Sequence, residues 1–146
     1  MTKKEKFDKY FMGVARLTSE NSYARRAKVG AILVKDGRIV ASGWNGQPAG
    51  FPNECEQEIT NPDGSVELTT LPTVIHSEAN LLTYCAKYGI PTDGAELYVT
   101  LSPCVKCALL IVQAGIKSVY YNEAYRDISG IELLCKSGVN VSQIKI

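Results

Sequence analysis

The sequence predicts an α/β protein, a three-layer α/β/α sandwich built around a five-stranded mixed sheet. Segments with strand and helix character alternate along most of the chain, which is typical of parallel strands joined by right-handed crossovers. An Asp-Gly pair between two apolar runs indicates one antiparallel hairpin before that alternation begins. The length of 146 residues and the 45% share of hydrophobic residues suit one compact domain over residues 1–146.

Three segments near the start of the chain suit regular elements. Apolar residues recur every three or four positions over residues 7–17, which predicts an amphipathic helix. Residues 29–34 and 38–44 are short apolar runs, and Asp36-Gly37 between them is a strong signal for a tight turn. The two runs are therefore expected to pair as antiparallel strands.

Residues 45–72 differ from the rest of the chain. Glycine or proline occupies seven of these positions, and no clear hydrophobic period runs through them. We expect a long loop, and loops of this length in a small domain are usually functional or mobile. The simpler alternative is a surface insertion. The segment leads directly to the helix expected to carry His76.

The second half of the chain alternates between helical and strand patterns. Gly89, Gly115 and Gly138 lie where each helical pattern stops, and a glycine in the left-handed conformation commonly ends a helix. The expected helices cover residues 74–88, 104–114 and 128–136, and the expected strands cover residues 97–100, 117–121 and 139–144.

Charge and hydropathy disfavour two classes of partner. The chain has 16 lysines and arginines against 15 aspartates and glutamates, a net charge of +1, whereas nucleic-acid binding usually needs a basic surface. No apolar run approaches the roughly 20 residues that span a bilayer. The N-terminus lacks the apolar region of a signal peptide. We therefore expect a cytoplasmic protein, in the host cytoplasm if the source is a virus, with no membrane or nucleic-acid partner.

The chain has one histidine, His76, and five cysteines. An odd number of cysteines at irregular spacing makes a poor disulfide framework. In a reducing compartment, a close C-x-x-C pair more often binds a metal or carries redox chemistry. Any metal site that uses an imidazole must use His76. The cysteines are Cys55, Cys85, Cys104, Cys107 and Cys135.

Two short motifs lie at expected helix starts, H-x-E at residues 76–78 and P-C-x-x-C at residues 103–107. Cys104 and Cys107 are three residues apart, so both thiols point to one side of their helix, where free N–H groups favour thiolates. Helix N-termini gather at the carboxyl edge of such a sheet, which allows His76 to join them. One histidine and two cysteines leave a fourth tetrahedral position open for water, the pattern of a catalytic zinc.

Glu78 lies two residues from His76, so its carboxylate is expected to point away from the ligands and beside that water. There it could take a proton from the water and pass it to a ring nitrogen and then to a leaving amine. H-x-E followed by P-C-x-x-C is the signature of zinc nucleobase deaminases. A structural zinc with a fourth ligand from Cys55, Cys85 or Cys135 stays open as an alternative.

Five segments carry a likeness that covers nearly the whole chain, namely residues 29–34, 43–50, 74–80, 98–104 and 114–117. In these segments the chain resembles the cytidine deaminase superfamily. The Asn-Gly-x-Pro-x-Gly pattern of residues 45–50 resembles the deoxycytidylate (dCMP) deaminases within it, rather than the tRNA adenosine or riboflavin-pathway deaminases. Ser77 stands where alanine is more usual, and its small size fits that position.

The resemblance implies zinc-dependent hydrolysis of dCMP to dUMP and ammonia, which supplies dUMP for thymidylate synthesis. It implies that His76, Cys104 and Cys107 hold Zn²⁺ and that Glu78 acts as the acid and base. Some phage members carry extra histidine and cysteine ligands for a second, structural zinc. Because this chain has no second histidine, one zinc ion per chain is expected.

The resemblance also implies regulation and assembly. Activation by dCTP, inhibition by dTTP and a homo-hexamer are expected from it, with Mg²⁺ as a companion of a bound triphosphate. In such enzymes the regulatory site lies near the Asn-Gly loop and a subunit interface. Asn45 and Gly46 are therefore candidate residues of the effector site.

Five residues are candidates for binding the substrate. The amide of Asn45 can hydrogen-bond a sugar hydroxyl or a ring group, and Ser102 belongs to a segment whose backbone could bind the base edge. A phosphate dianion calls for a guanidinium group, which Arg26 or Arg126 could supply. Tyr125 could stack on the base or sugar. The simpler alternatives are a solvated basic face around Arg26 and a packing role for Tyr125.

Three other functions stay open from the sequence alone. A deaminase of tRNA or single-stranded DNA would need positive contacts to flanking phosphates, which the near-zero net charge disfavours. A nucleoside deaminase would ignore the phosphate of dCMP. A non-catalytic protein would use its zinc only for assembly.

Overall fold

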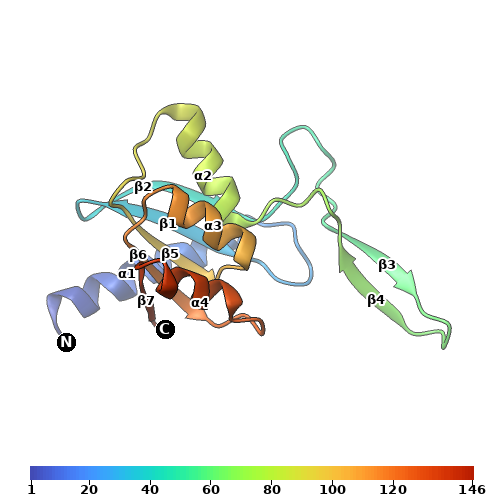
Figure 1. Cartoon of the computed structure of the whole chain (residues 1–146). Helices are drawn as coiled ribbons and strands as arrows, with labels where there is room; N and C mark the ends of the chain where they lie inside the picture. Colours follow the sequence, from blue (N-terminus) through green and yellow to red (C-terminus); the bar gives the residue numbers. More distant parts are fainter.

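Five strands form one mixed sheet in a computed structural model that describes residues 1–146 (Figure 1). In sheet order the strands are β2 (Arg38–Trp44), β1 (Gly30–Lys35), β5 (Glu96–Leu101), β6 (Ser118–Glu123) and β7 (Asn140–Gln143). Strand β1 runs antiparallel to both of its neighbours, and β5, β6 and β7 run parallel to one another. The predicted hairpin, the mixed sheet and the number of its strands are confirmed.

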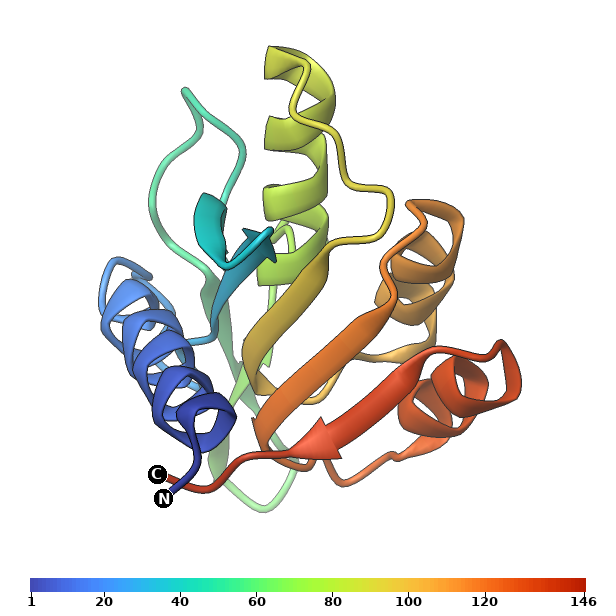
Figure 2. The same cartoon turned by 90° about the vertical axis from the view of Figure 1, so that its left-hand side faces the viewer.

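Four helices cover the two faces of this sheet (Figure 2). They are α1 (Lys3–Ser19), α2 (Ser77–Tyr88), α3 (Val105–Gln113) and α4 (Ser129–Lys136). Helix α1 packs on one face alone, whereas the other three helices lie on the opposite face. This arrangement confirms the predicted three-layer sandwich. None of the four helices has the length and apolar character needed to cross a membrane.

Strand β1 divides the core into two layers, because alternate side chains of a strand point to opposite faces. Ala31 and Leu33 pack with the layer beneath α2, α3 and α4, and Ile32 and Val34 pack with α1. All four side chains are fully buried. Burial of a leucine or isoleucine contributes about 1.5–3 kcal/mol, so both layers stabilise the sheet that carries the site.

The prediction of a loop over residues 45–72 is wrong for its second half. Strands β3 (Glu56–Thr60) and β4 (Val66–Thr70) pair there as a separate antiparallel hairpin around the turn at Gly64. Most of its side chains are exposed or half-buried on both faces, so the sequence has no apolar alternation. Pro62-Asp63-Gly64 is a strong turn signal that could have indicated this hairpin.

Three helices begin later than expected. Helix α4 begins at Ser129 instead of residue 128, and the other two begin beside candidate metal ligands. Helix α2 begins at Ser77, with His76 as its extended N-cap residue, instead of at residue 74. Gly46 and Ile75 exchange backbone hydrogen bonds of 3.1 and 2.8 Å, which keeps the segment before His76 extended. Likewise, Cys104 is the N-cap residue of α3. The corrections to α2 and α3 place candidate metal ligands at helix N-caps.

Close backbone contact seats α2 on β2. A Cβ atom at Gly43 would lie 2.6 Å from the carbonyl oxygen of Ser77 and 2.8 Å from the backbone nitrogen of Leu81. These distances are too short for any side chain, so only glycine allows this approach. The contact fixes the start of α2, where His76 and Glu78 lie.

We expect Gly43→Ala to lower the free energy of unfolding by about 1–3 kcal/mol, because the added methyl group must push α2 away from β2. Gly13→Ala is the matched control, since Gly13 lies in α1 and a Cβ there meets no atom within 4 Å. Alanine should stabilise that helix by up to about 1 kcal/mol. Urea denaturation measures both changes, and equal midpoints for the two variants would contradict the steric argument.

Candidate metal centre

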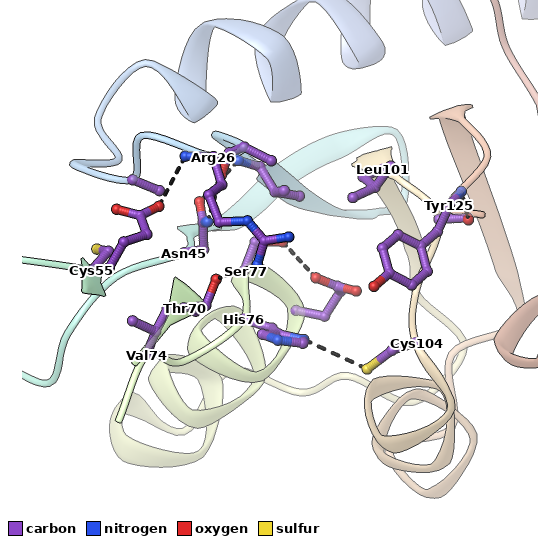
Figure 3. Close-up of a pocket in the computed structure, with 16 residues that line it drawn as sticks. Arg26, Asn45, Cys55, Thr70, Val74, His76, Ser77, Leu101, Cys104 and Tyr125 are labelled. Atoms are coloured by element: carbon purple, nitrogen blue, oxygen red, sulfur yellow. Dashed lines mark hydrogen bonds between the residues drawn. The ribbon is translucent and has the colours of Figure 1, made fainter. Parts of the chain in front are cut away.

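The topology of the sheet brings two helix starts together. Strands β2 and β5 run in the same direction, because each is antiparallel to β1 between them. Helix α2 follows β2 through the 45–75 segment, and α3 follows β5 directly. The N-termini of both helices therefore meet at one edge of the sheet. His76 and Cys104, the N-cap residues of α2 and α3, face each other there (Figure 3).

Three donor atoms converge at this edge. The Sγ atom of Cys104 lies 3.5 Å from Nδ1 of His76, and the Sγ atom of Cys107 lies 3.6 Å from the same nitrogen. All three atoms lie within 4.8 Å of one another. A tetrahedral zinc ion with ordinary Zn–S and Zn–N bonds separates nitrogen from sulfur by about 3.6 Å. The donor set thus fits zinc, with the His76 proton on Nε2.

The alternative of a structural zinc requires a fourth protein ligand, and the structure offers none from the other cysteines. Cys55, Cys85 and Cys135 do not belong to the group of donors around His76. Cys55 lies in the wall of the adjoining cavity, Cys85 belongs to the core under α2, and Cys135 is exposed on α4. Three ligands and a free fourth position remain the better description.

The local electrostatics explain why the sulfur of Cys107 suits a cation. Burial raises the pKa of the Cys107 thiol, and the nearby Glu78 carboxylate and Cys104 raise it further. A hydrogen bond from the backbone N–H of Ala79, in the first turn of α2, lowers the pKa in the opposite direction. A divalent cation compensates the charge of a buried thiolate, so metal binding and deprotonation of Cys107 favour each other.

Glu78 is a buried carboxylate beside these donors. It lies in the first turn of α2, and only 4% of the residue is exposed to solvent. The hydroxyl of Ser77 donates a 2.5 Å hydrogen bond to its Oε1 atom. Burial raises the pKa of Glu78, and the Ser77 hydrogen bond opposes that rise. A carboxyl group with a raised pKa in a cavity is suited to proton transfer.

A cavity of about 260 Å³ opens over the candidate metal centre (Figure 3). Four of the five residues predicted to bind the substrate line it, namely Arg26, Asn45, Ser102 and Tyr125. The side chains of Arg26 and Tyr125 point into the cavity from opposite sides. Arg126 does not line it, and its guanidinium group lies 5.9 Å from the centre of the Tyr125 ring. Of the two candidate arginines, only Arg26 reaches the cavity.

Asn45 and Ser102 also hold the walls of the cavity in place. The amide of Asn45 accepts a 2.9 Å hydrogen bond from the N–H of Val29 and donates one of 2.8 Å to the carbonyl of Ala27. The hydroxyl of Ser102 accepts a 2.7 Å hydrogen bond from the N–H of Tyr125. Each side chain therefore braces a neighbouring segment while it faces the cavity.

Sequence reasoning missed the two polar residues that the β3–β4 hairpin adds to the cavity wall, Glu56 and Thr70. Both come from the unpredicted hairpin, Glu56 at the start of β3 and Thr70 at the end of β4. No motif distinguishes Glu56 from the neighbouring Glu54 and Glu58 in the sequence. Only the spatial register of the hairpin shows which acidic residue turns inward.

Comparisons with known proteins agree with this site. The family described as the cytidine and deoxycytidylate deaminase zinc-binding region matches residues 5–123, which include both motifs. ComE operon protein 2 of Bacillus subtilis is 40% identical over 141 residues, covering 96% of this chain and 72% of that protein. The deoxycytidylate deaminase of Mycobacterium phage D29 is 38% identical over 121 residues, covering 79% of this chain and 93% of that protein.

A solved structure gives the same answer for the fold. The crystal structure of dCMP deaminase from the cyanophage S-TIM5, in complex with dCMP and dUMP, matches with a TM-score of 0.85 and 45% sequence identity. The match covers 99% of both chains, so it includes the sheet, the four helices and the edge at which His76 and Cys104 meet. The chain belongs to the cytidine and deoxycytidylate deaminase family.

Proposed function

We propose that this chain hydrolyses dCMP to dUMP and ammonia at a zinc ion held by His76, Cys104 and Cys107. The observation that carries this proposal is the convergence of the three donors at zinc-binding distances, beside the buried carboxylate of Glu78 in a cavity. The deoxycytidylate deaminase of phage D29 and the S-TIM5 dCMP deaminase support the choice of substrate.

A zinc ion in this position supplies Lewis-acid activation of water. Proton transfer is carried out by Glu78, a residue of the chain itself. The Glu78 carboxylate, oriented by Ser77, accepts a proton from the attacking water and delivers it to the ring nitrogen N3. It then passes the second proton of that water to the amino group that leaves as ammonia. Water is consumed, the exocyclic amine departs, and Glu78 returns to its carboxylate form.

Arg26 is the residue best placed for the phosphate of dCMP. Its Nη1 atom donates a 3.2 Å hydrogen bond to the hydroxyl of Thr70 at the cavity wall. A guanidinium group has five N–H donors, so the others stay available for a phosphate dianion. Tyr125, on the opposite side of the cavity, supplies a ring for contact with the base or sugar.

The physiological setting is proposed on the same basis. The dUMP product would supply thymidylate synthesis in the cytoplasm, where the thiol ligands stay reduced. We also propose that dCTP with Mg²⁺ activates the enzyme and that dTTP inhibits it. The chain is proposed to assemble as a homo-hexamer. The Asn45–Gly46 loop suits an effector site, because Gly46 is hydrogen-bonded to Ile75 directly before His76. Rates at subsaturating dCMP with each triphosphate, and the mass in solution, test these proposals.

The proposed function predicts ammonia release from dCMP that clearly exceeds release from deoxycytidine, CMP or a short deoxycytidine-containing oligonucleotide. Zinc-replete protein is assayed on all four side by side. Glu78→Gln is the matched control, because it removes the proton carrier but none of the three ligands. It should retain about one zinc ion per chain and lose at least about 100-fold in kcat. Activity on the oligonucleotide alone would contradict the proposed substrate.

A second prediction separates the two arginines. Arg26→Ala should lower kcat/KM for dCMP by about 10- to 100-fold and leave the value for deoxycytidine nearly unchanged, because the lost hydrogen bonds to a charged group concern only the phosphate. Arg126→Ala is the control, since its side chain lies outside the cavity. An equal loss on both substrates would remove Arg26 from the phosphate site.

A third prediction concerns pH. The Ser77 hydroxyl favours the charged form of Glu78, so Ser77→Ala should raise the pKa of that carboxyl group further. Catalysis needs the carboxylate, so activity on dCMP is lost as the pH falls through this pKa, and the acidic limb of kcat/KM should move to higher pH. Ser118→Ala, at the far end of β6, should leave the limb in place. An unmoved limb in Ser77→Ala would contradict this assignment.

A further inference from the structure

The β3–β4 hairpin meets the rest of the molecule mainly at its base, and an ion pair of 4.0 Å between Glu58 and Arg25 adds a contact farther along β3. Figure 1 shows both strands projecting away from the five-stranded sheet. The N–H of Leu71 donates a 2.8 Å hydrogen bond to the carbonyl of Cys55, which closes the base. Cys55, Glu56 and Thr70, all at this base, line the cavity. The attachment of the hairpin is therefore also a wall of the site.

Glu56 attaches the hairpin to the segment that carries Arg26. Its side chain is buried, with 3% of the residue exposed. Its Oε2 atom accepts hydrogen bonds of 2.9 Å from the backbone N–H groups of both Arg25 and Arg26. Bonds to a carboxylate are about twice as strong as bonds between neutral groups. The backbone at Arg26 is thus held from the hairpin side.

The positive charge of Arg25 lies close to the acidic residues at the base of the hairpin. Its Nη2 atom forms a 2.9 Å ion pair with Glu54, and its Nε atom lies 3.8 Å from Oε1 of Glu56. That Oε1 atom is buried and has no hydrogen-bond partner. Arg25 therefore faces the acidic residues of the hairpin, which leaves Arg26 as the arginine of this pair that lines the cavity.

The guanidinium group of Arg26 is held by β4, the second strand of the hairpin. Thr70 accepts the 3.2 Å hydrogen bond from Nη1 of Arg26. Thr70 and Glu56 are direct partners in the register of β3 and β4. One cross-strand pair therefore contacts both the backbone and the guanidinium group of Arg26.

We propose that Glu56 and Thr70 are positioning residues that make the enzyme specific for a nucleoside monophosphate, by holding Arg26 in the orientation that receives the 5′-phosphate. This inference rests on the proposed function. A guanidinium group that is already oriented loses less conformational freedom when the phosphate binds. The hairpin thus acts on phosphate recognition, whereas the donors that would hold zinc come from the starts of α2 and α3.

The test compares steady-state kinetics on dCMP and deoxycytidine. Thr70→Val keeps the shape of the side chain and removes the acceptor, and it should raise KM for dCMP about 3- to 10-fold with little change in kcat. Glu56→Ala should raise that KM about 10- to 100-fold. Glu56→Gln keeps an oxygen acceptor and should recover most of the loss. Deoxycytidine kinetics should stay within about twofold throughout.

Matched controls come from the same hairpin. Glu67→Ala and Thr69→Val alter exposed or half-buried neighbours that do not line the cavity, and they should leave both substrates unaffected. In an Arg26→Ala background, Thr70→Val should add nothing further, because the group that it positions is gone. Zinc content and thermal unfolding of each variant show whether it is folded, and Thr70→Val carries the test if Glu56→Ala fails to fold.

The outcomes separate the two proposals. Wild-type protein with no activity on dCMP would refute the proposed function and the positioning role with it. An active wild type in which Thr70→Val and Glu56→Ala impair dCMP and deoxycytidine equally, or add fully to Arg26→Ala, would refute the positioning role alone. A selective rise in KM for dCMP that disappears in the Arg26→Ala background would establish it.

Discussion

Close backbone contact at two glycines places the candidate metal centre. Gly43 lets the start of α2 lie directly on β2, and Gly130 in α4 lets its backbone meet Pro103 and Cys104 at the start of α3. The carbonyl oxygen of Pro103 occupies the space that a Cβ at Gly130 would need. The separation of His76 and Cys104 thus depends on close backbone packing on both sides, and close-packed interiors have low compressibility.

Two ionisable side chains at this edge of the sheet, Cys107 and Glu78, are buried, and burial disfavours their charged forms. Burial raises the pKa of both Cys107 and Glu78, so it favours the neutral form of each group. The surroundings oppose this in two separate ways. The N–H of Ala79 favours the Cys107 thiolate, and the hydroxyl of Ser77 favours the Glu78 carboxylate. A bound cation adds to both effects, so ligand binding and proton transfer depend on one another.

The sequence predicted the layers, the sheet and the donor set, because these follow from periodic patterns and from motifs at helix starts. It missed the β3–β4 hairpin, since strands exposed on both faces carry no apolar alternation. It also left Arg26 and Arg126 undecided. Both lie in loops, so the directions of their side chains depend on contacts with residues far along the chain, such as the bonds from Arg26 to Glu56 and Thr70.

The way in which the β3–β4 hairpin is attached to the domain indicates what the hairpin contributes to the protein. An isolated two-stranded hairpin is marginally stable in water, and this one buries little apolar surface against the domain. Its anchor is instead a buried carboxylate, Glu56, and burying such a charge is costly unless its hydrogen bonds are made. An apolar anchor would attach the hairpin at lower cost but could not bind the N–H groups of Arg25 and Arg26. The polar anchor is therefore better explained by the geometry of the site than by the stability of the fold.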